Sequence, residues 1–240
     1  MRSGNPALNV SAFTKVEKLA NAASMTINGT VNKTFLLLFI TVFSASWVWE
    51  NPVNFLPFLL PSAIAGMIIA FVTIFKKEWA PATSWIYALI EGLVLGAISA
   101  IMEKSYPGIV IQAVALTFGT LFCMLIAYKS KLIKVTENFR LGIVAATGAI
   151  ALIYIVSIVM GFFGSRIPFI HESGPIGIGF SLFVVAIAAF NLVLDFDFIE
   201  KGAEYRAPKY MEWYGAFALM VTLIWLYIEI LRLLSKTRRR

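Results

Sequence analysis

Residues 176–199 read IGIGFSLFVVAIAAFNLVLDFDFI, and the first charged side chain in this stretch is Asp195. A helix needs about 20 mostly apolar residues to cross the roughly 30 Å hydrocarbon core of a bilayer. The stretch meets that length, and it lacks the polar face that a helix at a water-exposed surface carries. It therefore predicts a membrane-spanning helix whose last third holds carboxyl groups.

Apolar runs of this kind recur along the whole chain, separated by short segments rich in charge, proline and glycine. Of the 240 residues, 60% are hydrophobic and 14% are charged, whereas about a quarter of the residues of a soluble domain are charged. We therefore expect an all-α integral membrane protein, a bundle of seven transmembrane helices. The expected helices are 34–49, 56–75, 83–101, 108–128, 141–163, 176–199 and 211–234.

This pattern divides the chain into three parts. Residues 1–33 form an N-terminal segment that is long enough to include a helix lying on the membrane surface. Residues 34–234 form the membrane domain, and residues 235–240 form a basic tail. The membrane domain contains Gly92 and Gly96 at the G-x-x-x-G spacing that lets membrane helices pack closely.

Basic residues are unevenly distributed between the two sides of the expected bundle, and cytoplasmic loops carry the excess of Lys and Arg. The loops on one side hold only Lys104 and Arg166. We therefore expect a multi-pass protein of the inner (plasma) membrane with its N-terminus in the cytoplasm. The opposite side holds thirteen basic residues: Arg2, Lys15, Lys18, Lys33, Lys76, Lys77, Lys129, Lys131, Lys134, Arg140, Lys201, Arg206 and Lys209.

The C-terminal tail does not follow this rule. Two arrangements are possible. The last helix crosses the membrane despite its basic end, which we favour because the earlier helices usually dominate orientation. Alternatively, it is re-entrant and returns the tail to the cytoplasm. After seven crossings, five basic residues would lie outside: Arg232, Lys236, Arg238, Arg239 and Arg240.

The composition also argues against nucleic-acid binding and against hydrolytic or zinc-dependent catalysis. The net charge of +7 does not indicate nucleic-acid binding, because the basic residues lie between the apolar runs and at the termini. His171, the only histidine, falls in an expected loop, so no span offers a histidine for a serine dyad or a zinc site. We expect no enzymatic activity and no cofactor other than transiently bound calcium.

A charged side chain within a span costs at least about 2.5–3.5 kcal/mol, which makes it a candidate functional group. Glu91 follows Ser84 by seven residues, which places it about 10 Å into its helix. Asp195 lies about one turn from the end of its helix, and Asn191 precedes it on the same face. A carboxylate and an amide oxygen together suit a hard cation or a shared proton. Asp195 and Glu91 are therefore the candidate metal ligands.

Three further acidic residues are candidates for sensing protons or ions. Asp197 points roughly 200° away from Asp195, and we interpret it as a residue of the helix end or of a gate. Simple solvation at the membrane interface is the alternative for both. Glu229 has Arg232 three residues later, which allows a local ion pair. Glu212 lies near the expected start of its helix, and it is therefore nearer in depth to Asp195 than Glu229 is.

Five short stretches of the chain are distinctive: MRSGNP (1–6), GTVNKT (29–34), EGLVLGAIS (91–99), NLVLDFDFI (191–199) and WLYIE (225–229). Together they resemble the bacterial branch of the transmembrane Bax inhibitor motif family, over essentially the whole chain. The resemblance implies seven helices, with the last enclosed by the others. Some members behave as pH-sensitive calcium leak channels, in which a carboxylate late in the sixth helix and another in the seventh share protons and ions. Asp195 fits the first position, whereas Glu229 lies farther along the chain than the family pattern expects.

These observations lead to a hypothesis and two rivals. The hypothesis is a pH-gated cation (calcium) leak pathway that closes when carboxyl groups are protonated. The first rival is a non-conducting protein that regulates another membrane protein, such as a membrane protease. The second, a small-solute transporter, predicts inverted repeats, and the sequence shows none. The expected partners are the lipid bilayer, calcium ions or protons and, for the first rival, another membrane protein.

Overall fold

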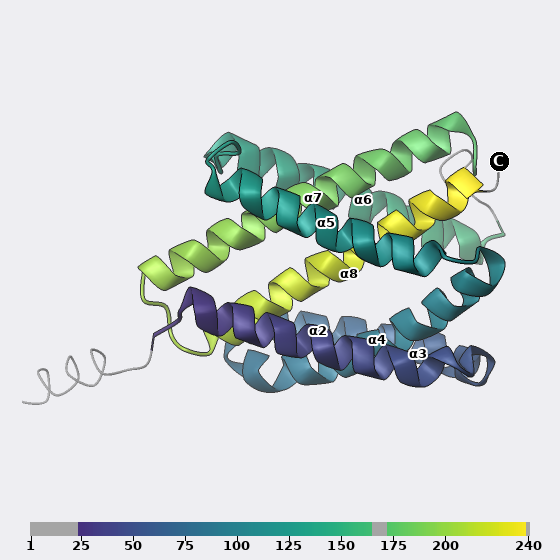
Figure 1. Cartoon of the computed structure of the whole chain (residues 1–240), viewed down its shortest axis with the longest axis horizontal. Helices are drawn as coiled ribbons and strands as arrows, with labels where there is room; N and C mark the ends of the chain where they lie inside the picture. The colour runs from purple at the N-terminus through teal and green to yellow at the C-terminus, as the bar shows by residue number, and fades with distance from the viewer. Residues whose placement is uncertain (1–23, 165–171, 239–240) are drawn as a thin grey trace, which may run out of the picture.

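The computed structural model describes residues 24–164 and 172–238, and seven long helices make up most of this part of the chain (Figure 1). All seven are long and apolar enough to cross a membrane. The predicted all-α, seven-helix membrane fold is confirmed. The elements are α2 (Ile27–Trp49), α3 (Pro52–Phe75), a 3₁₀ turn η2 (Lys77–Trp79), α4 (Ala80–Ser105), α5 (Ile109–Lys129), α6 (Glu137–Phe162), α7 (Pro175–Glu204) and α8 (Met211–Arg238).

The first described helix, α2, begins at Ile27 rather than at residue 34, so the predicted start was wrong. Thr26 caps α2, because its hydroxyl accepts a hydrogen bond from a backbone N–H of the first turn. The hydroxyls of Thr30 and Thr34 donate to carbonyl groups one turn earlier, so these polar side chains need no water. The polar stretch before the apolar run is therefore helical, and the boundary after residue 33 falls inside α2.

The last helix, α8, runs without a break to Arg238, so the tail expected at 235–240 begins within it. Its 28 residues span about 42 Å at 1.5 Å per residue, more than the hydrocarbon core of a bilayer. Its end lies beside the start of α5, where Arg238 donates to the carbonyl of Pro107 and to the side-chain oxygen of Gln112. The helix crosses the bundle rather than turning back, and this cation of the tail is held by polar groups of the bundle.

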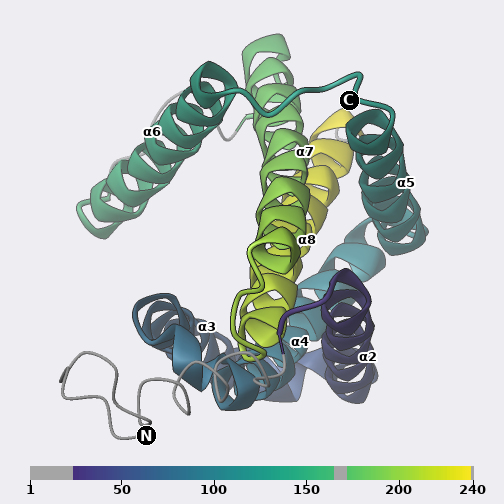
Figure 2. The same cartoon turned by 90° about the vertical axis from the view of Figure 1, so that its left-hand side faces the viewer.

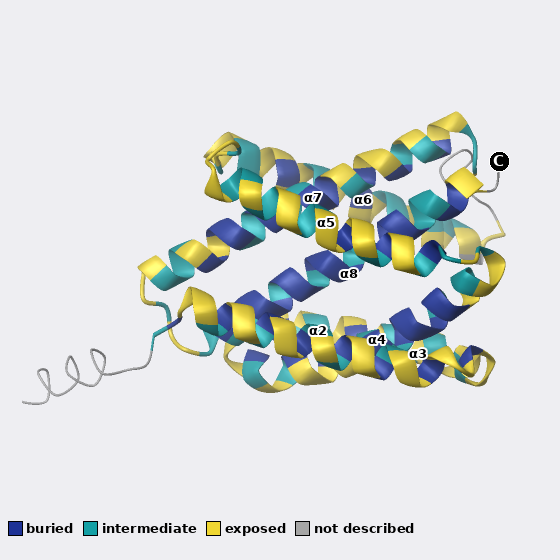
Figure 3. Ribbon diagram, in the orientation of Figure 1, coloured by how far each residue is buried: buried dark blue, intermediate teal, exposed yellow. Residues whose placement is uncertain are grey.

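The centre of the bundle is α8, which contacts α2, α4, α5 and α7. Figure 2 shows α8 together with α7 between the outer helices, and in Figure 3 most of α8 is dark blue or teal, meaning buried or intermediate. By contrast, α3 and α6 expose large apolar side chains, among them Phe58, Phe71, Leu152 and Ile158, to the surroundings of the bundle. The enclosure of the last helix, implied by the family resemblance, is confirmed.

Two glycines bring α2 and α4 close together. A Cβ atom on Gly92 would lie 2.4 Å from the carbonyl oxygen of Thr41, and one on Gly96 would lie 2.4 Å from that of Ala45. Backbone atoms cannot move away as a flexible side chain can, so any larger residue would push the two helices apart. The close-packing role predicted for the glycine pair is confirmed at this interface.

Candidate functional site: carboxyl groups inside the bundle

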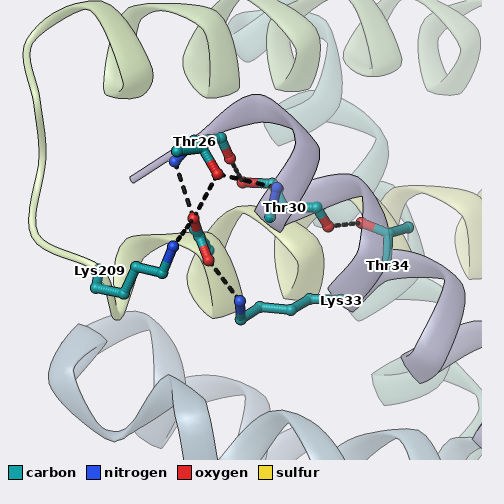
Figure 4. A network of polar contacts seen from close by, with 7 residues as sticks. Thr26, Thr30, Lys33, Thr34 and Lys209 are labelled. Carbon is teal, nitrogen blue, oxygen red and sulfur yellow. Dashed lines mark hydrogen bonds and ion pairs between the residues drawn. The ribbon is translucent and has the colours of Figure 1, made fainter. Parts of the chain in front are cut away.

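One carboxyl group, that of Glu212 at the start of α8, is fully enclosed and fully paired. Its side chain has 0% exposure and forms ion pairs with Lys33 of α2 and with Lys209, the second at 2.8 Å. Thr26 donates from its backbone N–H at 2.9 Å and from its hydroxyl at 2.8 Å. Figure 4 shows Thr26 and Lys33, from the first turns of α2, and Lys209, from the α7–α8 connection, around one carboxyl group. The cluster joins α2 to the α7–α8 connection. A structural role therefore accounts for the buried carboxyl group of Glu212.

The carboxyl group of Asp195 has a very different environment, at the interface of α7 and α8. Its Oδ2 atom is buried and has no hydrogen-bond partner within residues 24–164 and 172–238. Two polar side chains of α8 lie near Asp195: Thr222, which is beside the carboxyl group, and Tyr214. A neutral carboxyl can be enclosed there, whereas a charged one needs water or a cation.

The two residues expected on one face of α7, Asn191 and Asp195, contact different neighbouring helices. The Asn191 side chain donates to the hydroxyl of Thr147 in α6 at 2.9 Å and to the carbonyl of Ile187 at 2.9 Å. Asn191 therefore turns towards α6, while Asp195 lies against α8. The four-residue spacing does place both residues on one face of α7. That face, however, packs against α6 at Asn191 and against α8 at Asp195.

Asp197 also faces α6 and is part of an ion-pair cluster. Its Oδ2 atom accepts from Arg140 of α6 at 3.0 Å and from Lys201, one turn later on α7, at 2.8 Å. The residue is buried, so it is more than a solvated end of the helix. The cluster connects α6 to α7, and the predicted role of Asp197 in a gate stays a prediction.

Glu229 is buried near the other end of α8. One oxygen accepts from the hydroxyl of Tyr154 in α6 at 2.8 Å and from Arg232 at 2.8 Å, so the local ion pair expected from the sequence is present. The second oxygen, Oε2, is buried with no hydrogen-bond partner in the described part of the chain. Lys236, which bonds to Gly177 and Ser181 of α7, is a further cation in the vicinity.

Glu91 lies at the interface of α3 and α4. Its carboxyl group packs against Gly66 of α3, where an added Cβ would come within 2.7 Å of Oε1. No ion pair involving Glu91 occurs among the described residues. Like Asp195, Glu91 has no ion pair in the described chain, and it lies on a different interface from Asp195.

The structure separates the acidic residues in depth as well as by interface. Measured along the helices, Asp195 lies about 14 Å from the end of α7, and Glu91 about 16 Å from the start of α4, on the same side of the bundle. Glu229 lies about 27 Å from the start of α8, roughly twice as deep. Asp195 and Glu229 therefore cannot share a proton directly in this arrangement, and Glu212 contacts neither of them.

No group of three or more histidine, cysteine, aspartate or glutamate side chains that could hold a metal ion exists among residues 24–164 and 172–238. The role of Asp195 and Glu91 as metal ligands stays a prediction. His171 lies outside the described residues. The polar partners Lys33, Tyr154 and Thr222 were missed from the sequence. One signal was present for Lys33: a threonine at position 26 can cap a helix, and a helix that begins there includes Lys33 instead of leaving it in the N-terminal segment.

Comparison with known families now places the chain. A family model described as Bax inhibitor 1 like matches residues 5–239, which include all seven helices. A comparison with curated proteins gives no match. Because the matched region is nearly the entire sequence, the chain belongs to the Bax inhibitor 1 like family.

Proposed function

We propose that this membrane protein is a pH-sensitive leak pathway for cations, with calcium as the transported ion and Asp195 as the group that controls it. The activity is transport rather than catalysis. In this proposal the protein lies in the inner (plasma) membrane, with the N-terminus in the cytoplasm, as the distribution of basic residues indicates.

One observation carries the proposal: a carboxyl oxygen of Asp195 is buried between α7 and the central helix α8 without a hydrogen-bond partner in the described chain. Buried polar atoms are nearly always paired, and an exception calls for an explanation. Structural roles explain the carboxyl groups of Glu212 and Asp197, which hold cations from other segments. No such role explains Asp195.

The direction of the pH response follows from the charge. A protonated Asp195 is neutral and can remain enclosed between α7 and α8, which corresponds to a closed pathway. Loss of the proton creates a charge that favours water or a cation over the apolar interior, so α7 and α8 separate and cations enter. We therefore expect the flux to rise with pH and to fall as the pH is lowered.

The test is calcium flux into vesicles that contain the purified chain, measured with a dye inside the vesicles over a series of pH values. The wild-type flux should fall as the pH is lowered. Asp195→Asn should remove most of this pH response, because an amide does not titrate. Glu91→Gln measures whether Glu91, which also has no ion pair in the described chain, contributes to the pH response.

The matched control is Glu204→Gln, which removes the same charge from an exposed position on α7. It should leave the flux and its pH response unchanged. If Asp195→Asn and Glu91→Gln both behave like this control, the proposal is wrong. If even the wild-type chain shows no flux, the non-conducting regulator of another membrane protein becomes the better hypothesis.

A further inference from the structure

A groove of about 550 Å³ runs between α2 and α5, on the side of the bundle that holds the α5–α6 loop. The edges of the groove are formed by apolar side chains that are largely exposed, such as Phe35 of α2 and Phe122 of α5. Its floor is formed by Phe196 of α7 and Leu219 of α8. The volume is within the range of about 300–1,000 Å³ that is typical of ligand sites. Figure 2 shows α2 and α5 on the same side of the central helices.

Three lysines line the same groove at its polar end: Lys129, Lys131 and Lys134. All three are exposed, and none of them forms an ion pair within the described ranges. They follow the last apolar turn of α5, where a membrane helix leaves the hydrocarbon core. The groove therefore combines apolar walls with three unpaired positive charges at one end.

Two acidic residues also line this end, but other groups already engage them. Asp197 is held by Arg140 and Lys201. Glu200 accepts a hydrogen bond from the hydroxyl of Tyr128. A neutral hydroxyl does not cancel the charge of Glu200, so three lysines share this end of the groove with one carboxylate that has no ion pair in the described chain. The charge that a ligand meets there is positive on balance.

The backbone of the α5–α6 loop keeps these lysines at the groove. Lys131 adopts a left-handed conformation with φ of 58°, which is uncommon for a residue other than glycine. The chain then folds back, and the N–H of Ile133 donates to the carbonyl of Ala127 at 3.2 Å. This geometry attaches the loop to the end of α5 instead of letting it extend away from the groove.

We propose that the groove binds an anionic phospholipid from the leaflet that meets the α5–α6 loop. An acyl chain would lie between α2 and α5, and the phosphate group would contact Lys129, Lys131 and Lys134. Basic residues near the membrane surface attract anionic lipids, while the apolar walls accommodate the acyl chain. The site does not involve Asp195, so the proposal does not depend on whether the protein conducts ions.

The test is native mass spectrometry of the purified full-length chain, with phosphatidylglycerol and phosphatidylcholine that carry the same acyl chains. The wild-type chain should retain phosphatidylglycerol preferentially. Lys131→Gln combined with Lys134→Gln should lower the preference roughly tenfold, because each lysine near the surface contributes to the attraction. The control, Lys76→Gln with Lys77→Gln, removes two exposed charges at the same end of the bundle, outside the groove.

A second pair of variants tests the apolar part of the groove. Val31→Trp adds bulk inside it and should reduce retention of phosphatidylglycerol, whereas Val144→Trp, on an exposed face of α6, should not. Equal retention of the two lipids by the wild-type chain would overturn the proposal. An equal loss in the groove variants and their controls would do the same.

Discussion

Two carboxyl groups at the core of the protein, those of Glu212 and Asp195, are enclosed in opposite ways. Glu212 contacts two lysines and both donor groups of Thr26. Asp195 has a buried oxygen with no hydrogen-bond partner, and it forms no ion pair, in the described part of the chain. Enclosure alone therefore does not identify a functional group in a membrane protein. The partners determine whether the carboxyl group holds the fold together or is free to change its protonation state.

The comparison extends to the other acidic residues. Asp197 resembles Glu212, because it joins α6 to α7 through cations. Glu229 lies between the two cases, with one oxygen paired and the other not. If this distinction is correct, the loss of stability on neutralising each residue should follow the number of its partners. The following predictions test that order.

The largest loss of stability is expected for Glu212→Gln. Removing one partner of a buried ion pair leaves the other charge without compensation, which costs about 3–5 kcal/mol. The lower end of this range applies, because Lys209 is half exposed and can turn towards water. The measurement is thermal unfolding in detergent, with Glu204→Gln as the exposed control. A melting temperature equal to that of the control would break the comparison.

An intermediate loss is expected for Glu229→Gln. The amide oxygen can still accept from Tyr154, but Arg232 loses its ion pair. Hydrogen bonds to charged groups contribute about 1.5–3 kcal/mol, and the partial exposure of Arg232 favours the low end. Unfolding of Tyr154→Phe in the same assay separates the two contacts of this oxygen. A loss larger than that of Glu212→Gln would contradict the order.

The two lysines that hold Glu212 should differ from each other. The Lys33 side chain is 18% exposed and that of Lys209 is 50% exposed, and exposed ion pairs contribute about 0.2–1 kcal/mol. Lys33→Gln should therefore destabilise the protein by more than Lys209→Gln. Thermal unfolding of the two single variants gives the comparison, and equal losses would show that the enclosure of Lys33 adds nothing.

The smallest loss is expected for Asp195→Asn, which should unfold within about 1 kcal/mol of the wild-type chain, because no ion pair or hydrogen bond of Oδ2 is lost. The same substitution should have the largest effect on the pH response of calcium flux. A strongly destabilised Asp195→Asn would show that the carboxyl group supports the fold, and it would remove the basis of the proposed function.

The sequence predicts much of this architecture because apolar length and small-residue spacing are local properties. The seven helices, the close packing at Gly92 and Gly96, and the acidic residues within spans could all be read along the chain. The start of α2 was predicted too late, because a polar stretch was expected to lie outside the helix, whereas the hydroxyl groups of Thr30 and Thr34 are satisfied within it. A polar stretch therefore continues into the helix instead of ending it.

The partners of the acidic residues are less predictable, since they depend on how helices pack. Lys33 and Glu212 are 179 positions apart in the chain, and nothing local relates them. Asn191 and Asp195 share a stripe of α7, yet one meets α6 and the other meets α8. Helical spacing fixes the direction of a side chain, but only the neighbouring helices decide what it contacts.

The most direct test of the account is the protonation of Asp195 itself. Infrared difference spectra of the reconstituted protein between high and low pH report the carbonyl stretch of protonated carboxyl groups. All thirteen acidic residues contribute to this region at low pH, so the Asp195 component is isolated by comparing variants. We predict a band from an enclosed carboxyl group that grows as the pH is lowered in the wild-type protein and in Glu204→Gln, and that is missing in Asp195→Asn. The same band in Asp195→Asn, or no band in the wild-type protein, would contradict the central claim that Asp195 changes its protonation state inside the bundle.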